Sequence, residues 1–187
     1  MISEGILHIT DIQGYDHMLF LLALCAPYSY LDWKKIIWMA TAFTVGHSIT
    51  LALSAMDIIR FSSDLIELLI PITIMITAVW NVLSLKFRFT GTDWVRYAVT
   101  AGFGLIHGMG FSTYLRIILT QASSLIKELF LFNLGVEIGQ LVIISGILIL
   151  IFVLVRVIKL PNPKVNVILS SFAFLIAAWL VYGKLVE

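Results

Sequence analysis

The chain has 187 residues, of which 60% are hydrophobic and only 12% are charged, and its mean hydropathy is +1.04. A soluble domain is about half apolar and about a quarter charged, so these few charged groups cannot cover a water-facing surface of this size. The net charge of +1 argues against nucleic acid as a partner, and the single cysteine, Cys25, excludes an intrachain disulfide and a cysteine-based metal cluster.

Long apolar segments follow one another along the chain with short polar interruptions between them. A helix needs about 20 apolar residues to cross about 30 Å of hydrocarbon, and open sheet edges are not tolerated in lipid. We therefore predict a single transmembrane domain over residues 1–187, an all-α integral membrane protein with a bundle of six transmembrane helices, seven being possible. The predicted spans are 14–30, 34–56, 64–85, 94–119, 128–155 and 166–185.

The positive charges are unevenly divided between alternate loops. Eight Lys and Arg side chains fall in one set of loops and four in the other, and the richer set is expected in the cytoplasm. This places both termini outside, an N-out/C-out topology in the cell membrane. The richer set contains Lys34, Lys35, Lys86, Arg88, Arg96, Arg156, Lys159 and Lys164; the poorer set contains Arg60, Arg116, Lys127 and Lys184.

Ionisable side chains recur inside the predicted spans, although a buried Asp, Lys or Arg costs about 2.5–3.5 kcal/mol on insertion scales. His47 lies about 21 Å from the inner end of its span, and Glu137 lies about two and a half turns from the outer end of its own. Because successive helices alternate in direction, such groups meet in one outer-to-middle layer. The groups at this depth are Asp16, His17, His47, Glu67, His107 and Glu137.

Imidazole and carboxylate groups without thiolate suit borderline divalent ions such as Ni, Co, Zn, Fe(II) and Mn. The layer is therefore predicted to hold a metal or proton site, and a purely structural network between His and Glu is the alternative. His8, on the outer tail, is the weaker candidate, and Asp64 is equally well explained as a helix cap. The supporting polar residues are Thr44, Ser48, Asp64, Glu67, Asn133 and Gln140.

Glycines four residues apart occur on two of the predicted spans. Gly104 and Gly108 flank His107, and Gly135 and Gly139 flank Glu137. Small residues at this spacing let helix backbones approach closely. We therefore expect His107 and Glu137 to lie on tightly packed neighbouring helices.

Four segments, taken in order, resemble the HupE/UreJ family of membrane proteins. The resemblance implies a helical bundle in the inner membrane of a bacterium, from a group of hydrogenase and urease accessory proteins that includes nickel permeases. By this likeness the candidate metal ligands are Asp16, His17, His47, His107 and Glu137. The segments are Gly14-Tyr15-Asp16-His17 followed by MLFLLAL, FTVGHSITLAL at 43–53, FGLIHGMGF at 103–111 and FNLGVEIGQ at 132–140.

The chain also departs from the nickel-permease pattern. Those members carry a histidine before the Asp-His pair with five residues between, whereas here that position is Thr10 and the nearest histidine is His8. The helix that carries His107 also has fewer histidines than their signature. The chain therefore resembles a divergent branch of the family.

Three functions agree with these observations. The first is a permease for a divalent ion, with nickel, cobalt or zinc as the metal. The second is a membrane-embedded metal-dependent enzyme, either a zinc-type hydrolase in which a three-histidine site activates water or a metal oxidoreductase. The third is a structural or accessory subunit, acting as a homo-oligomer or with an accessory-protein partner. The exit path of a permease would be thin, because its polar groups carry no charge: Thr41, Thr73, Thr77, Asn81 and Ser84.

Overall fold

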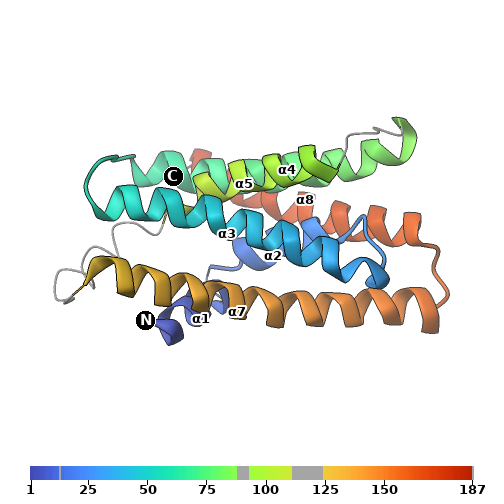
Figure 1. Cartoon of the computed structure of the whole chain (residues 1–187). Helices are drawn as coiled ribbons and strands as arrows, with labels where there is room; N and C mark the ends of the chain where they lie inside the picture. The colour runs from blue at the N-terminus through green and yellow to red at the C-terminus, as the bar shows by residue number, and fades with distance from the viewer. Residues whose placement is uncertain (13, 88–92, 111–123, 187) are drawn as a thin grey trace.

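The computed structural model describes residues 1–12, 14–87, 93–110 and 124–186 (Figure 1). All regular elements in these ranges are helices, which confirms the all-α prediction for them. A 3-10 turn, η1, precedes α3, and a π-helical turn, η2, follows α7. The elements are α1 (Ile2–Thr10), α2 (Asp16–Cys25), η1 (Tyr30–Asp32), α3 (Trp33–Ala55), α4 (Ser63–Phe87), α5 (Asp93–Gly110), α7 (Leu125–Phe152), η2 (Val153–Val157) and α8 (Asn162–Val186).

Four of the helical stretches are long and apolar enough to cross a membrane, which supports a multi-pass membrane protein. They are Tyr30–Ala55, Ser63–Lys86, Leu125–Val157 and Asn162–Val186. The predicted span at 94–119 is described only as far as α5, and its remainder, with Arg116, lies outside the described residues. Arg88 also lies outside them. The predicted count of six spans is therefore not confirmed.

The first predicted span is a much shorter helix. α2 has 10 residues, which is about 15 Å and half the thickness of the hydrocarbon core. It ends before Pro27, whose ring nitrogen has no hydrogen to continue the helical ladder. Because α2 packs against α3, α4, α7 and α8, it lies inside the bundle, where it does not cross the membrane by itself (Figure 1).

A buried polar network holds the inner half of α2 in place. The Asn81 amide on α4 donates to the Ala23 carbonyl of α2 at 2.7 Å. The Asn166 amide on α8 donates to the Asn81 carbonyl at 3.2 Å, and the Ser170 hydroxyl donates to the Asn166 side chain at 3.0 Å. These bonds fix the depth of α2, and with it the depth of the residues at its beginning.

Glycines allow two pairs of helices to pack with their backbones in contact. A Cβ atom on Gly5 of α1 would collide with the Phe132 carbonyl of α7, and one on Gly135 would collide with the Ile2 carbonyl. The segment expected to be an outer tail is thus a helix, α1, that packs closely against α7.

The second close pair is α3 with α5. A Cβ atom on Gly104 would collide with the Phe43 carbonyl, and one on Gly108 would collide with the His47 carbonyl. The prediction that His107 and Glu137 lie on tightly packed neighbours is therefore wrong. Gly104 and Gly108 of α5 face α3, and Gly135 and Gly139 of α7 face α1, because small residues mark a close approach without specifying the partner helix.

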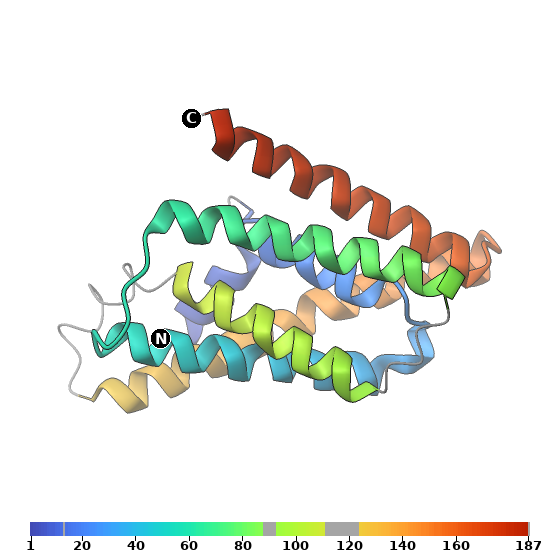
Figure 2. The same cartoon turned by 90° about the horizontal axis from the view of Figure 1, so that it is seen from above.

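Both termini lie at the same end of the bundle in the two perpendicular views (Figures 1 and 2). The connection between α3 and α4 lies at that end too, and the connection between α7 and α8 lies at the other. We call these the outer end and the inner end, following the orientation that the charge count predicts. The sidedness itself stays a prediction.

Candidate metal centre

All four histidines of the chain meet in one place, each from a different helix. The ring centroid of His17 lies 4.7 Å from that of His8, 5.4 Å from that of His107 and 6.4 Å from that of His47. The centroids of His8 and His47 are 5.8 Å apart. We call these four rings the histidine cluster. His8, the weaker candidate from the sequence, belongs to it.

Three of the rings are close enough to share an ion. One nitrogen each of His8, His17 and His47 lies within 4.8 Å of the others. Ligands at about 2.1 Å in a tetrahedral site lie about 3.4 Å apart, so these nitrogens need to move inward by roughly an ångström. The arrangement is therefore close to a three-nitrogen site before any ion binds.

Unpartnered nitrogens show that the cluster fits a cation. His47 is fully buried and His107 is 1% exposed. Among the described residues, no hydrogen bond is made by Nε2 of His17, by either ring nitrogen of His47 or by Nδ1 of His107. Buried polar atoms are nearly always hydrogen-bonded in native proteins, so lone pairs left over in a shared pocket point to a ligand.

Asp16 orients His17 at the start of α2. Its Oδ1 atom accepts a hydrogen bond from the His17 backbone N–H at 2.8 Å and lies 3.1 Å from Nδ1 of the same residue. The carboxylate sits in the first turn of α2, where the helix dipole favours negative charge. A carboxylate on one ring nitrogen leaves the other, Nε2, as the ligand atom.

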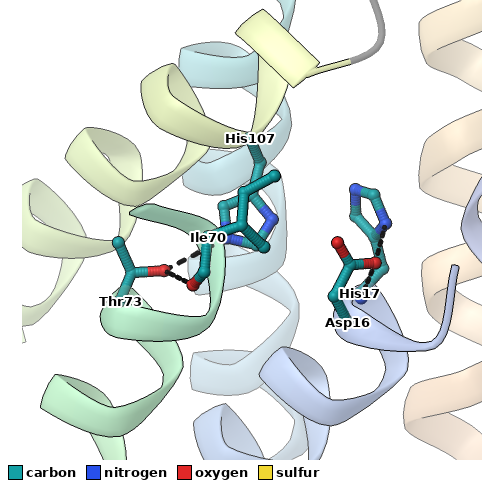
Figure 3. A network of polar contacts seen from close by, with 5 residues as sticks. All are labelled: Asp16, His17, Ile70, Thr73 and His107. Carbon is teal, nitrogen blue, oxygen red and sulfur yellow. Dashed lines mark hydrogen bonds and ion pairs between the residues drawn. The ribbon is translucent and has the colours of Figure 1, made fainter. Parts of the chain in front are cut away.

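His107 is held from the opposite side by α4. Its Nε2 atom lies 3.2 Å from the Thr73 hydroxyl, and its ring lies between Thr73 and the Asp16–His17 pair (Figure 3). From the sequence alone, Thr73 is expected only as one of the uncharged polar groups of an exit path. A threonine on a neighbouring helix gives no signal in the sequence that it contacts this ring.

Glu137 lies beside the histidine cluster, outside the three-histidine group. Its Oε1 atom accepts a hydrogen bond from Thr41 at 2.7 Å, and the Thr44 hydroxyl donates to Gln140 at 2.9 Å. Asn133 of α7 lies near His47 of α3. Residues at this contact between α3 and α7, Ser48 among them, line a groove of about 360 Å³.

Of the two acidic residues on α4, only Glu67 approaches the site. It accepts from Ser63 at 2.9 Å and pairs with Lys184 of α8 at 2.6 Å. Glu67, Lys184 and Asp16 line one pocket of about 230 Å³, which we call the outer pocket. Asp64 is exposed in the first turn of α4, and the Leu65 N–H at the start of this helix donates to the Ser62 hydroxyl, so the expected cap is Ser62 and not Asp64. The outer pocket therefore leads to the carboxylate that holds His17.

An aromatic layer closes the cluster on its inner side. The Phe20 and Phe43 rings are 4.9 Å apart, and they lie 5.3 Å and 5.0 Å from His107. Phe103 stands edge-on to Phe20 at 6.3 Å. Together the three phenylalanines form a layer of apolar rings next to His107.

Beyond the layer is a small cavity of about 30 Å³ with both apolar and polar side chains in its wall, which we call the inner pocket. The side chains of Asn81, Thr100 and Arg96 line it together with Phe103. The Arg96 guanidinium lies over the ring of Tyr28 at 5.7 Å, at the inner end of the bundle. The cluster thus lies between two pockets whose walls include charged side chains, and the phenylalanine layer separates it from the inner one.

Comparison with known proteins gives a family but no individual relative. The model of a family described as HupE / UreJ protein matches residues 1–183, which include the whole histidine cluster. No curated protein and no solved structure matches the chain. The resemblance carried by the four sequence segments is therefore confirmed.

Proposed function

Because this chain belongs to the HupE/UreJ family, a group associated with metal transport and accessory functions, we propose that it is a membrane permease for a divalent transition-metal ion. The observation that carries the proposal is the convergence of all four imidazoles inside the bundle. Nitrogen ligands without thiolate favour an ion of the nickel, cobalt or zinc kind.

The outer pocket is the proposed access route. An arriving cation would meet Glu67 and Asp16 there, and it would compete with the Lys184 ammonium for the Glu67 carboxylate. Hydrated divalent ions lose water most easily when charged oxygens replace it. The two carboxylates therefore lower the cost of moving the ion from water toward His17.

The histidine cluster is the proposed binding site. His8, His17 and His47 supply nitrogen ligands, and His107 supplies a fourth. In this arrangement Asp16 orients a ligand. Glu137 supports α3 through Thr41.

The aromatic layer is the proposed inner gate. Phe20 and Phe43 separate the cluster from the inner pocket, so the ion leaves only when these rings move apart. With the cytoplasm negative, a divalent ion moving inward gains about 4.6 kcal/mol per 100 mV, which is enough to drive uptake without ATP.

Metal analysis and flux together test the proposal. The purified protein is expected to retain about one Ni, Co or Zn ion per chain, and His47→Ala is expected to retain much less, because one of the nitrogen ligands is removed. Wild-type proteoliposomes are expected to take up the same ion when the inside is made negative. If neither bound metal nor flux is found for Ni, Co, Zn, Fe and Mn, the permease is refuted.

A membrane-embedded metalloenzyme is the second candidate, and the closed aromatic layer favours it. A site that opens only outward needs no exit path, and Asp16 beside His17 supplies a carboxylate for proton transfer. Bound metal that depends on His47, combined with an absence of flux for all five ions, would support the enzyme over the permease.

A further inference from the structure

The Thr73 hydroxyl has two polar neighbours, and their chemistry decides where its proton lies. Its oxygen is 2.7 Å from the Ile70 carbonyl oxygen and 3.2 Å from Nε2 of His107 (Figure 3). A carbonyl oxygen only accepts hydrogen bonds, so the single hydroxyl proton points to Ile70. Thr73 can then only accept from His107, which places the imidazole proton on Nε2.

This assignment determines the other nitrogen of the His107 ring. A neutral imidazole has one N–H and one lone pair, so a proton on Nε2 leaves the lone pair on Nδ1. Nδ1 is buried and has no hydrogen-bond partner in the described part of the chain. The ring lies between Thr73 and the Asp16–His17 pair, 5.4 Å from the His17 ring (Figure 3).

A similar arrangement occurs on the facing side of the cluster. Asp16 Oδ1 lies 3.1 Å from Nδ1 of His17 as an ion pair, and among the described residues neither nitrogen of that ring makes a hydrogen bond. Each of these two histidines thus has an oxygen acceptor next to one ring nitrogen. An acceptor at the ring nitrogen that does not bind the metal fixes the tautomer and the orientation of metal-binding histidines in proteins.

We propose that Thr73 is a positioning residue, which holds His107 as the Nε2–H tautomer and so presents Nδ1 as the fourth nitrogen ligand of the histidine cluster. The inference rests on the proposed metal site and specifies its coordination. It identifies which nitrogen of His107 completes a four-nitrogen site, with ligands from four helices, and which residue holds that ring in place.

Two substitutions separate this role from simple packing. Thr73→Val keeps the size of the side chain but removes the acceptor, whereas Thr73→Ser keeps the acceptor. In protein labelled with ¹⁵N-histidine, the His107 signals are assigned by their loss in His107→Gln. In the metal-free protein, Thr73→Val is expected to shift His107 toward the Nδ1–H tautomer, and Thr73→Ser is expected to keep the wild-type shifts.

Metal binding supplies the second measurement. Thr73→Val is expected to weaken Ni²⁺ or Zn²⁺ binding by about 10- to 100-fold, the range found for outer partners of metal-bound histidines, and Thr73→Ser to restore it. An unchanged tautomer and affinity in Thr73→Val, with metal bound by the wild type, overturns this inference alone. A wild type that binds none of these ions overturns the fourth-ligand assignment together with the proposed function, whatever the tautomer does.

Discussion

Removing the charge of Asp16 is predicted to weaken metal binding while leaving the fold intact. In Asp16→Asn the amide oxygen can still accept the hydrogen bond that the His17 backbone donates at 2.8 Å. What is lost is a negative charge 3.1 Å from Nδ1 of His17, on the side of the ring opposite the proposed ligand atom. The variant therefore tests electrostatics at the cluster with little change in shape.

The size of the effect follows from the geometry. Across the imidazole ring and a metal–nitrogen bond of about 2.1 Å, an ion on Nε2 of His17 lies about 7 Å from the Asp16 carboxylate. At an effective dielectric constant of about 20, a divalent ion and a unit charge at that distance attract by about 5 kcal/mol. Relaxation of the protein around the ion reduces the attraction below this upper value. Removing a residue that contacts a metal ligand from outside usually lowers metal affinity about 10- to 100-fold. We expect the Asp16→Asn loss to fall in that range.

Competition with a fluorescent chelator measures the affinity of the purified protein for Ni²⁺ or Zn²⁺. Asp64→Asn is the matched control, because Asp64 carries the same group at an exposed helix start away from the histidines. Glu137→Gln is expected to change affinity by less than tenfold, since that carboxylate engages Thr41. Equal affinities for Asp16→Asn and Asp64→Asn, or a Glu137→Gln loss larger than that of Asp16→Asn, would refute the reasoning.

Three further predictions concern the surroundings of the cluster. His8→Ala should reduce metal affinity at least tenfold, the same loss that is expected for His17→Ala, and a titration showing no loss would remove His8 from the site. Phe43→Ala should raise the rate of metal flux into proteoliposomes, because the aromatic layer loses one of its rings; an unchanged or slower rate contradicts a gate there. Gly104→Ala should lower the melting temperature in detergent, because its Cβ would meet the Phe43 carbonyl, whereas Gly102→Ala has open space and should be neutral.

Burial costs explain what the sequence could predict. Imidazoles at His17, His47 and His107 are expensive in lipid, and alternating helices bring groups at one depth together. The structure brings these three rings together. It was also possible to recognise the membrane class and the family, because both depend on composition and on local motifs.

Contacts between distant segments explain what the sequence could not predict. His8 reaches the cluster because α1 packs on α7 through Gly5 and Gly135, and no local pattern specifies that pairing. The apolar run after Asp16 was interpreted as a full span, yet α2 stops at half the membrane thickness. The Glu137 carboxylate accepts a hydrogen bond from Thr41, a residue 96 positions away in the chain.

The displaced histidine links these results to the family. The nickel-permease pattern has a histidine at the position of Thr10, and here the Thr10 hydroxyl donates to the Ile6 carbonyl of its own helix at 2.8 Å. His8, two residues earlier on the same helix, lies 4.7 Å from the His17 ring. In this chain α1 therefore brings His8 to the cluster, and the residue at the position of the pattern's histidine, Thr10, bonds within its own helix.

X-ray absorption at the metal edge of the Ni- or Zn-loaded protein tests the central claim most directly. The account predicts four nitrogen scatterers at about 2.0–2.1 Å with the multiple scattering of imidazole rings, and fewer imidazoles in His8→Ala and in His47→Ala. A first shell made of oxygen alone, or a spectrum that neither substitution changes, would contradict it.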